Sequence, residues 1–201
     1  MRAVRLTVRD YAHGTGAEGV NAIESAELSE DSPRANTGVA EGLARLVLRE
    51  LAERMSAHEG LEVFAAHRSK FEGWLKVELA AILRERFRSV VPEKNRVDLV
   101  TDDWAFEVKV ADASYRHPRA VPKSRPITES VRSVVEDAWK LRGLSGCKHK
   151  AVIFAALPMP GRSLEAWRAH LSKIRRELRE LYSLSFRFRN GVPGAVYFGL
   201  V

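Results

Sequence analysis

The middle of the chain places two carboxylates and a lysine close together in the sequence, at Asp98, Glu107 and Lys109. Carboxylates that face each other repel, so this arrangement is costly unless a positive charge lies between them. A divalent cation such as Mg²⁺ prefers hard oxygen ligands and lowers the pKa of a bound water. A nearby lysine then orients that water or stabilises the charge that develops on a phosphorus atom. The three residues therefore predict a metal site with hydrolytic chemistry.

A β-hairpin is the element that would bring these side chains together. Residues 96–100 and 104–110 have the apolar and β-branched content of strands, and the turn-favouring pair Asp102-Asp103 separates them. With a two-residue turn at this pair, Asp98 lies directly opposite Glu107, and Lys109 shares their face because side chains alternate along a strand. An odd-numbered loop would instead place the two carboxylates on opposite faces.

The segment before the hairpin predicts a helix over residues 70–88. Ser69 and Glu72 have the spacing of a capping box, in which the two side chains accept hydrogen bonds from backbone donors at a helix start. The apolar stripe of this helix runs through Phe71, Leu75, Leu79 and Ile82. Glu78 falls in the middle of that stripe, and a carboxylate there needs a partner. Glu78 is therefore a candidate for the same site.

The combination of Asp98, eight intervening residues and Glu107-Val108-Lys109 resembles the motif of the PD-(D/E)XK nucleases, the restriction-endonuclease-like superfamily. The resemblance implies that Asp98 and Glu107 bind Mg²⁺ or Mn²⁺, that the main-chain carbonyl of Val108 is a further ligand, and that Lys109 assists catalysis. It also implies that a helix before the hairpin contributes a glutamate, and Glu78 stands at that place. The proline of the motif is absent, but that position varies and the ligands are intact.

The same resemblance implies an α/β fold, with a restriction-endonuclease-like core in which a mixed central sheet is flanked by helices. After the hairpin, residues 111–127 predict a loop, 128–142 and 163–181 predict helices, and 150–157 predict a buried strand with parallel pairing. Ser163 is the expected N-cap of the second helix. A closing hairpin is indicated at 182–189 and 195–201, joined through Asn190-Gly191.

Two regions follow from this reading. Residues 69–201 are expected to form the nuclease-like domain. Residues 1–68 are expected to form an accessory extension with a strand over 2–9, a loop over 12–38 and an amphipathic helix over 39–57.

Basic residues are concentrated in the second half of the chain. Residues 101–201 carry 18 Lys and Arg against 10 Asp and Glu, whereas residues 1–100 carry 15 against 16. This asymmetry fits a surface that binds a polyanion, although a solvated arginine-rich surface has the same composition. We expect phosphate contacts from the basic residues of the 163–181 helix and, around the site, from Arg116, Arg119, Lys123, Arg125 and Lys140. Asp137 and Lys140 lie where the resemblance implies a residue near the active site, with a solvated pair as the alternative.

The cysteine content and the hydropathy pattern limit the class of protein. A single cysteine, Cys147, excludes an internal disulfide and a cysteine-based zinc cluster. No apolar run resembles a signal peptide or a membrane span, so we expect a cytoplasmic protein without a membrane partner. The tryptophans Trp104, Trp139 and Trp167 are expected to pack in the core or the hairpin rather than to stack on bases.

These observations predict a metal-dependent nuclease that hydrolyses phosphodiester bonds, with DNA as the expected substrate. One site per chain would favour a homodimer if both strands are cut. Two alternatives remain open. One is a catalytically silent protein of the same fold that binds nucleic acid or supports an assembly. The other is an unrelated basic interaction domain in which the acidic residues form surface ion pairs.

Overall fold

The computed structural model describes residues 34–122, 126–160 and 164–201. The helices are α1 (Arg34–Ala57), α2 (Glu59–His67), α3 (Glu72–Arg84), α4 (Ile127–Arg142) and α5 (Leu164–Arg175). The strands are β1 (Val90–Lys94), β2 (Val97–Thr101), β3 (Trp104–Asp112), β4 (His149–Leu157), β5 (Glu180–Arg187) and β6 (Pro193–Leu200). No helix in the described ranges is both long enough and apolar enough to cross a membrane.

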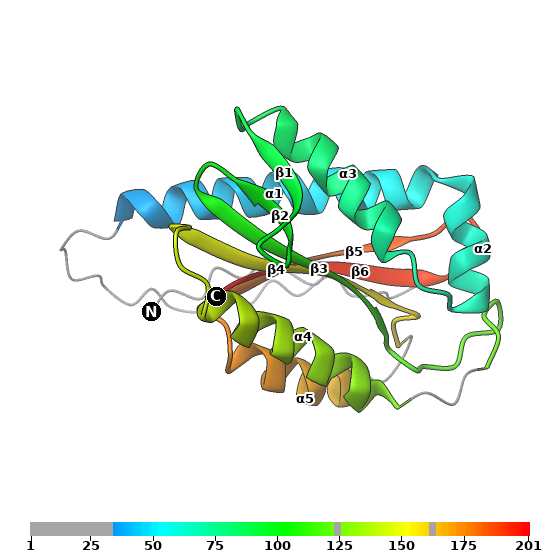
Figure 1. Cartoon of the computed structure of the whole chain (residues 1–201). Coiled ribbons are helices and arrows are strands. Elements are labelled where there is room, and N and C mark those ends of the chain that lie inside the picture. Colours follow the sequence, from blue (N-terminus) through cyan, green and yellow to red (C-terminus); the bar gives the residue numbers. More distant parts are fainter. Residues whose placement is uncertain (1–33, 123–125, 161–163) are drawn as a thin grey trace, which may run out of the picture.

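One mixed sheet of six strands, in the order β1-β2-β3-β4-β6-β5, forms the centre of the molecule. β3 and β4 are parallel, and the other neighbouring strands are antiparallel. Helices α1 and α3 cover one face of the sheet and α4 and α5 cover the other (Figure 1). The predicted α/β architecture with a mixed, helix-flanked sheet is therefore confirmed.

Two hydrophobic clusters hold these layers together, and the alternation of side chains along β3 assigns residues to each. Trp104, Phe106 and Val108 belong to the cluster beneath α1 and α3. Ala105 and Ala111 belong to the cluster beneath α4 and α5. β4 contributes buried side chains to both clusters, as expected for a strand covered on both faces.

The central hairpin has the predicted register. Leu99 pairs with Phe106 and Val100 pairs with Ala105, which leaves Asp102 and Asp103 as the turn. Thr101 Oγ1 accepts a hydrogen bond from the Trp104 backbone N–H at 3.0 Å and closes this turn. The loop is therefore even, as predicted, but the paired residues end at Leu99. Val97 and Leu99 belong to the clusters on opposite faces of the sheet, so the alternation of side chains is interrupted at Asp98, and Asp98 does not form the expected pair with Glu107.

Three local predictions differ from the structure. Helix α3 begins at Glu72 after an N-cap at Phe71, which makes no side-chain cap, and it ends at Arg84 rather than at 88. The capping box is therefore wrong, because Glu72 instead accepts a hydrogen bond from the backbone N–H of Val110 at 3.1 Å. Helix α5 ends at Arg175, since Arg179 donates its backbone N–H to Leu200 of β6 at 2.8 Å and the chain joins the sheet. Ser163 lies outside the described residues.

Two elements were not predicted from the sequence. Strand β1 is an edge strand that contains Pro92, which an edge tolerates because proline has no N–H to donate to a further strand. Its turn to β2 uses Asn95 and Arg96, both with positive φ. Helix α2 is short, and it is capped by His58 Nδ1, which accepts from the Leu61 N–H at 3.3 Å.

The N-terminal helix belongs to the main core. α1 begins at Arg34, before the predicted Val39, and packs along β5 and β6. Its residues Val47, Leu51 and Met55 are fully buried in the same cluster as Phe106. The position after residue 68 therefore does not separate two hydrophobic cores. The predicted strand over 2–9 and the loop up to residue 33 lie outside the described residues.

Candidate active site

The edge of β3 that faces β2 carries the candidate site. The ladder between these strands includes Leu99 and Val100 of β2, and Asp98 lies just beyond these paired residues. There the Asp98 carboxylate takes over as acceptor, because its Oδ2 accepts from the Val108 N–H at 2.8 Å. The Glu72 carboxylate accepts a hydrogen bond from the Val110 N–H, two residues further along β3. The carbonyl of Val108 points to this edge as well, since the N–H and C=O of one strand residue face the same neighbour.

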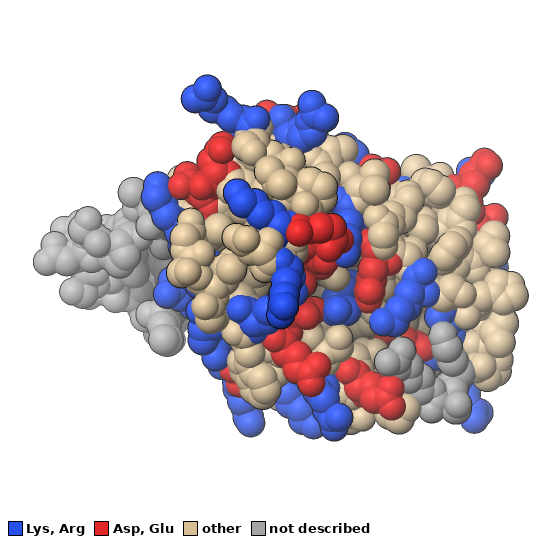
Figure 2. All heavy atoms as spheres, in the orientation of Figure 1, with Lys and Arg blue, Asp and Glu red and all other residues tan. Residues whose placement is uncertain are grey.

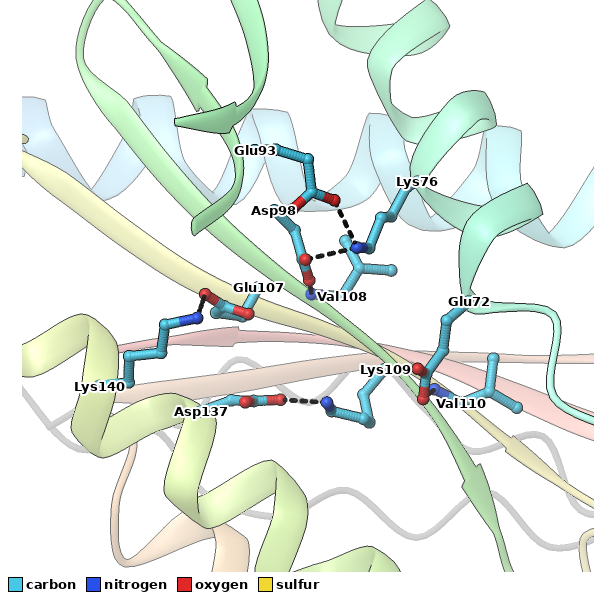
Figure 3. A network of polar contacts seen from close by, with 10 residues as sticks. All are labelled: Glu72, Lys76, Glu93, Asp98, Glu107, Val108, Lys109, Val110, Asp137 and Lys140. Carbon is cyan, nitrogen blue, oxygen red and sulfur yellow. Dashed lines mark hydrogen bonds and ion pairs between the residues drawn. The ribbon is translucent and has the colours of Figure 1, made fainter. Parts of the chain in front are cut away.

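Glu107 and Lys109 alternate with these valines and point to the α4 side of the sheet. Lys140 Nζ of α4 lies 2.5 Å from Glu107 Oε1, and Lys109 Nζ lies 3.1 Å from Asp137 Oδ2 (Figure 3). Asp98 Oδ1 lies 2.7 Å from Nζ of Lys76, which comes from α3. Three carboxylates and three lysines from α3, β2, β3 and α4 therefore meet at one place.

A fourth carboxylate joins this cluster from the edge strand. Glu93 of β1 has a positive φ of 54°, a conformation that is strained for a residue with a side chain. Its Oε1 accepts from Lys76 Nζ at 2.8 Å. Lys76 thus bridges β1 and β2, and Figure 2 shows basic and acidic side chains intermixed at the centre of this face of the molecule.

Burial makes the charges of this cluster unusual. Glu107 is only 3% exposed and is one of three polar or charged residues buried in the described part of the chain, with Arg68 and Thr101. Burial raises the pKa of Glu107 to about 7, with Asp98 and Asp137 adding to the rise and Lys140 opposing it. Burial also raises the pKa of Asp137, against the opposing effect of Lys109. A second positive charge near Glu107 would therefore be strongly stabilised.

The lysines respond to their acidic neighbours in the opposite direction. Burial lowers the pKa of Lys109, but Asp137, Glu72 and Asp98 outweigh it, and the net pKa is raised. Lys76 behaves in the same way, because Asp98 and Glu93 outweigh its burial. Both side chains are consequently ammonium ions over the whole physiological pH range.

The donor atoms fit a hard divalent cation in their chemistry. Asp98, Glu107 and Asp137 offer carboxylate oxygens, the ligands that Mg²⁺ and Mn²⁺ prefer. Glu107 Oε1 and Asp137 Oδ2 are buried and make no hydrogen bond of good geometry, although each has a lysine at ion-pair distance. Within the described ranges, no three His, Cys, Asp or Glu side chains are arranged to hold a metal ion. Lysine ammoniums instead neutralise each carboxylate.

The predicted catalytic residues are brought together, with one exception. Asp98, Glu107, Lys109 and the edge at Val108 converge as described above. Glu78 does not reach them, because Oε2 of its carboxylate accepts a hydrogen bond from Nη1 of Arg54 of α1 at 2.7 Å. The glutamate of α3 that faces β3 is Glu72. The sequence pattern had assigned that residue to a helix cap.

The residues predicted to contact phosphates lie in different surroundings. Arg116 is exposed, whereas Arg119 donates to the backbone carbonyl of Asn190 at 2.7 Å and so braces the turn between β5 and β6. Lys123 and Arg125 lie outside the described residues. Lys140 lies in the cluster itself, on Glu107.

A small polar cavity lies beside Lys109, further along β3. Its volume is about 40 Å³, and it is lined by Arg68, Lys109, Asp112 and serines of α4. The buried Arg68 pairs with Asp112, and Nε of its guanidinium donates to Oδ1 at 3.1 Å. No local sequence pattern indicates that Arg68 and Asp112 would pair, so this ion pair was not predicted.

Comparisons with protein-family models, with curated proteins and with solved structures find no match for this chain.

Proposed function

We propose that this protein is a metal-dependent nuclease that hydrolyses phosphodiester bonds in DNA. The observation that carries the proposal is the convergence of Asp98, Glu107 and Lys109 at the point where β2 leaves the edge of β3. Two carboxylates and a lysine, at the end of the ladder between β2 and β3, provide oxygen ligands and a cation within one small region. This is the arrangement that the PD-(D/E)XK resemblance implies.

Each residue has a role that follows from its position. Asp98 and Glu107 would hold Mg²⁺ or Mn²⁺, with the carbonyl of Val108 as a further ligand. The metal would supply an activated water and Lewis-acid stabilisation of the phosphoryl oxygens. Lys109 would orient the attacking water and stabilise the charge that develops on the phosphate. Asp137, at 3.1 Å from Lys109 Nζ, fixes the position and the charge of that ammonium.

The lysines that pair with the ligands are able to move aside. The side chain of Lys140 is 42% exposed and that of Lys76 is 29% exposed, whereas the Glu107 side chain is only 4% exposed. Long flexible stems allow both ammoniums to leave the carboxylates without unfolding the site. Released in this way, each ammonium would be available to a phosphate oxygen of the bound strand.

Asp98→Asn tests the proposal. Asparagine keeps an oxygen that accepts from the Val108 N–H but removes the charge that would hold the metal. We expect wild type to cleave DNA with Mg²⁺ or Mn²⁺ and Asp98→Asn to lose at least about a hundredfold in rate, with unchanged circular dichroism. The assay should cover single-stranded and duplex DNA and RNA, so that narrow specificity does not hide activity. Cleavage that persists unchanged in Asp98→Asn would refute the assignment.

One observation favours a second candidate, a catalytically silent nucleic-acid-binding or assembly protein of this fold. Each carboxylate of the site already has a lysine partner, at 2.7 Å for Asp98 and 2.5 Å for Glu107. A site built for these ion pairs alone would need no metal. Mn²⁺ titration separates the two candidates, because a silent protein would show no binding that Asp98→Asn removes.

A further inference from the structure

A second basic surface lies at the C-terminal end of α4, around Arg142. It surrounds a cavity of about 460 Å³, within the range of ligand sites. Its basic lining residues come from α4, β4, the loop between them and the turn after α5. They are Arg142, Lys148, Lys150, Arg176 and Arg179. We call these five residues, together with the neighbouring Trp139, the α4–α5 basic surface.

The acidic content of this surface is low and already neutralised. Among the described residues that line the cavity, Glu177 is the one side-chain carboxylate, and Arg142 Nη1 lies 3.2 Å from its Oε2. Lys150 donates to the carbonyls of Arg142 and Leu144, which compensates the partial negative charge at the C-terminal end of α4. These contacts leave a surplus of positive charge in the cavity.

Arg176 and Arg179 carry that surplus. Within the described part of the chain, neither side chain forms a hydrogen bond or an ion pair. Their backbone is nevertheless held firmly, since Arg176 N–H donates to Ser172 at 3.2 Å and Arg179 N–H donates to Leu200 at 2.8 Å. Two guanidiniums without a competing partner, on a fixed turn beside a cavity, are available to bind phosphate oxygens.

Trp139 adds an aromatic surface to these cations. It is 53% exposed, which corrects the expectation that it packs in the core, whereas Trp104 and Trp167 are each 2% exposed. Its indole N–H donates to Glu177 Oε2 at 2.8 Å, the same oxygen that Arg142 contacts. The ring is thus anchored at one edge beside the cavity, and more than half of its surface is open to a planar ligand.

From this geometry we infer that the α4–α5 basic surface binds an unpaired nucleic-acid strand, with phosphates at Arg176 and Arg179 and a base stacked on Trp139. Stacking aromatics beside a cationic groove are the features that bind single strands without sequence preference, because every base has a π-face. A duplex offers phosphates but no free base face. The inference deepens the proposed function by naming the form of the substrate, a DNA with a single-stranded segment that extends beyond the cleavage site.

Binding to a single-stranded oligonucleotide tests the inference. A labelled strand of about 12 nucleotides is titrated with the full chain in EDTA, and both anisotropy and tryptophan fluorescence are followed. We expect quenching of the exposed Trp139, a loss of that quenching in Trp139→Phe, and a roughly tenfold weaker affinity for Trp139→Ala. Arg176→Ala/Arg179→Ala should weaken binding and flatten the slope of log affinity against log salt by about 1 to 1.5.

The matched control is Arg84→Ala/Arg86→Ala, which removes the same charge at the end of α3, on the other face of the sheet. Thermal unfolding verifies that each variant folds. Equal loss of affinity in the two double variants would reduce the surface to unspecific charge and overturn the inference. So would a duplex that quenches Trp139 as strongly as a single strand, or deoxythymidine monophosphate that binds as tightly as the oligonucleotide.

The measurement is independent of catalysis, because EDTA removes divalent metal. Strand binding with the expected variant pattern, but without cleavage in Mg²⁺, would refute the proposed nuclease and leave this inference intact. Cleavage by wild type together with unaltered strand binding in Arg176→Ala/Arg179→Ala would overturn this inference and leave the proposed nuclease intact.

Discussion

At the scale of single residues, the site is a balance between carboxylates and ammoniums. Lys76, Lys109 and Lys140 hold the positions that a divalent cation would compete for. In the proposed function, a bound metal would have to displace two of these contacts, so the lysines would partly set its affinity. Substitutions that change the charge of the site are therefore expected to affect metal affinity more than substitutions that change its shape.

Lys76→Met tests this competition. The substitution keeps most of the apolar stem and removes the ammonium that lies 2.7 Å from Asp98 Oδ1. We expect the Kd for Mn²⁺, measured by calorimetry, to fall by about five- to tenfold, because a charge contact near the surface contributes about 1 kcal/mol or more. The control is Lys148→Met, whose side chain is 76% exposed and pairs with Asp103. A lower affinity in Lys76→Met would contradict the competition.

Glu107 makes the stability of the fold depend on pH. Its pKa is raised to about 7 in the folded protein by burial, from 4.5, so the folded state binds more protons than the unfolded state between these values. Its contribution to the free energy of unfolding is therefore most favourable below pH 4.5 and is lost as pH rises through 7.

Glu107→Gln removes this loss of stability at high pH, because glutamine does not ionise. In EDTA, we expect Glu107→Gln to be more stable than wild type by about 1–2 kcal/mol at pH 8, and to differ little at pH 5. The gain is smaller than the full pKa shift would give, because Lys140 loses its partner. Urea unfolding at the two pH values measures it. Destabilisation by Glu107→Gln at pH 8 would show that the Lys140 pair dominates.

At the scale of elements, side chains continue the sheet where β2 ends. Asp98 and Glu72 accept from the N–H groups of Val108 and Val110, which have no strand partner there. Buried backbone donors are costly when unpaired, so these two carboxylates stabilise the edge that the candidate site uses. The position of α3 relative to β3 is consequently tied to the chemistry of the site.

Glu72→Ala should loosen this edge. Without the acceptor at 3.1 Å, the Val110 N–H loses its partner, and we expect a destabilisation of about 1–2 kcal/mol. Glu72→Gln keeps an acceptor oxygen and should lose less than half as much. Amide hydrogen exchange at Val110 provides the local measurement, with Glu85→Ala at the exposed C-cap of α3 as the control. Unchanged exchange in Glu72→Ala would mean that the contact does not protect this amide.

At the scale of the whole molecule, α1 is a structural part of the folded unit. It covers β5 and β6, and its Leu51 is fully buried in the cluster that also supports Phe106 and Val108 beneath the site. The site therefore depends on residues on both sides of position 68.

Leu51→Ala and a fragment of residues 69–201 test this dependence. We expect Leu51→Ala to cost about 2–5 kcal/mol in urea unfolding, as for other fully buried leucines, and Arg49→Ala, with a side chain 62% exposed, to cost less than about 0.5 kcal/mol. The fragment 69–201 should lack a cooperative melting transition, because removing α1 exposes an apolar sheet face. A fragment that melts cooperatively would identify an independent domain after residue 68.

Features that depend on near neighbours along the chain could be predicted from the amino-acid sequence. Alternation of apolar residues and a two-residue turn predicted the hairpin register, in which Leu99 pairs with Phe106 and Val100 with Ala105. The same local rules predicted the parallel β4 and the hairpin of β5 and β6. These predictions succeed because strand period and turn length are properties of the adjacent backbone.

Contacts between residues far apart in the sequence followed from the packing of helices on the sheet. Glu72 rather than Glu78 faces β3, because packing against both α1 and the sheet sets the rotation of α3 about its axis. The carboxylate of Glu78 instead accepts a hydrogen bond from Arg54, 24 positions away in the sequence. The lysine partners of Asp98 and Glu107 also come from separate helices, and the exposure of Trp139 depends on how α5 lies beside α4. Helical period limits such residues to a face, but only the assembled layers determine what that face contacts.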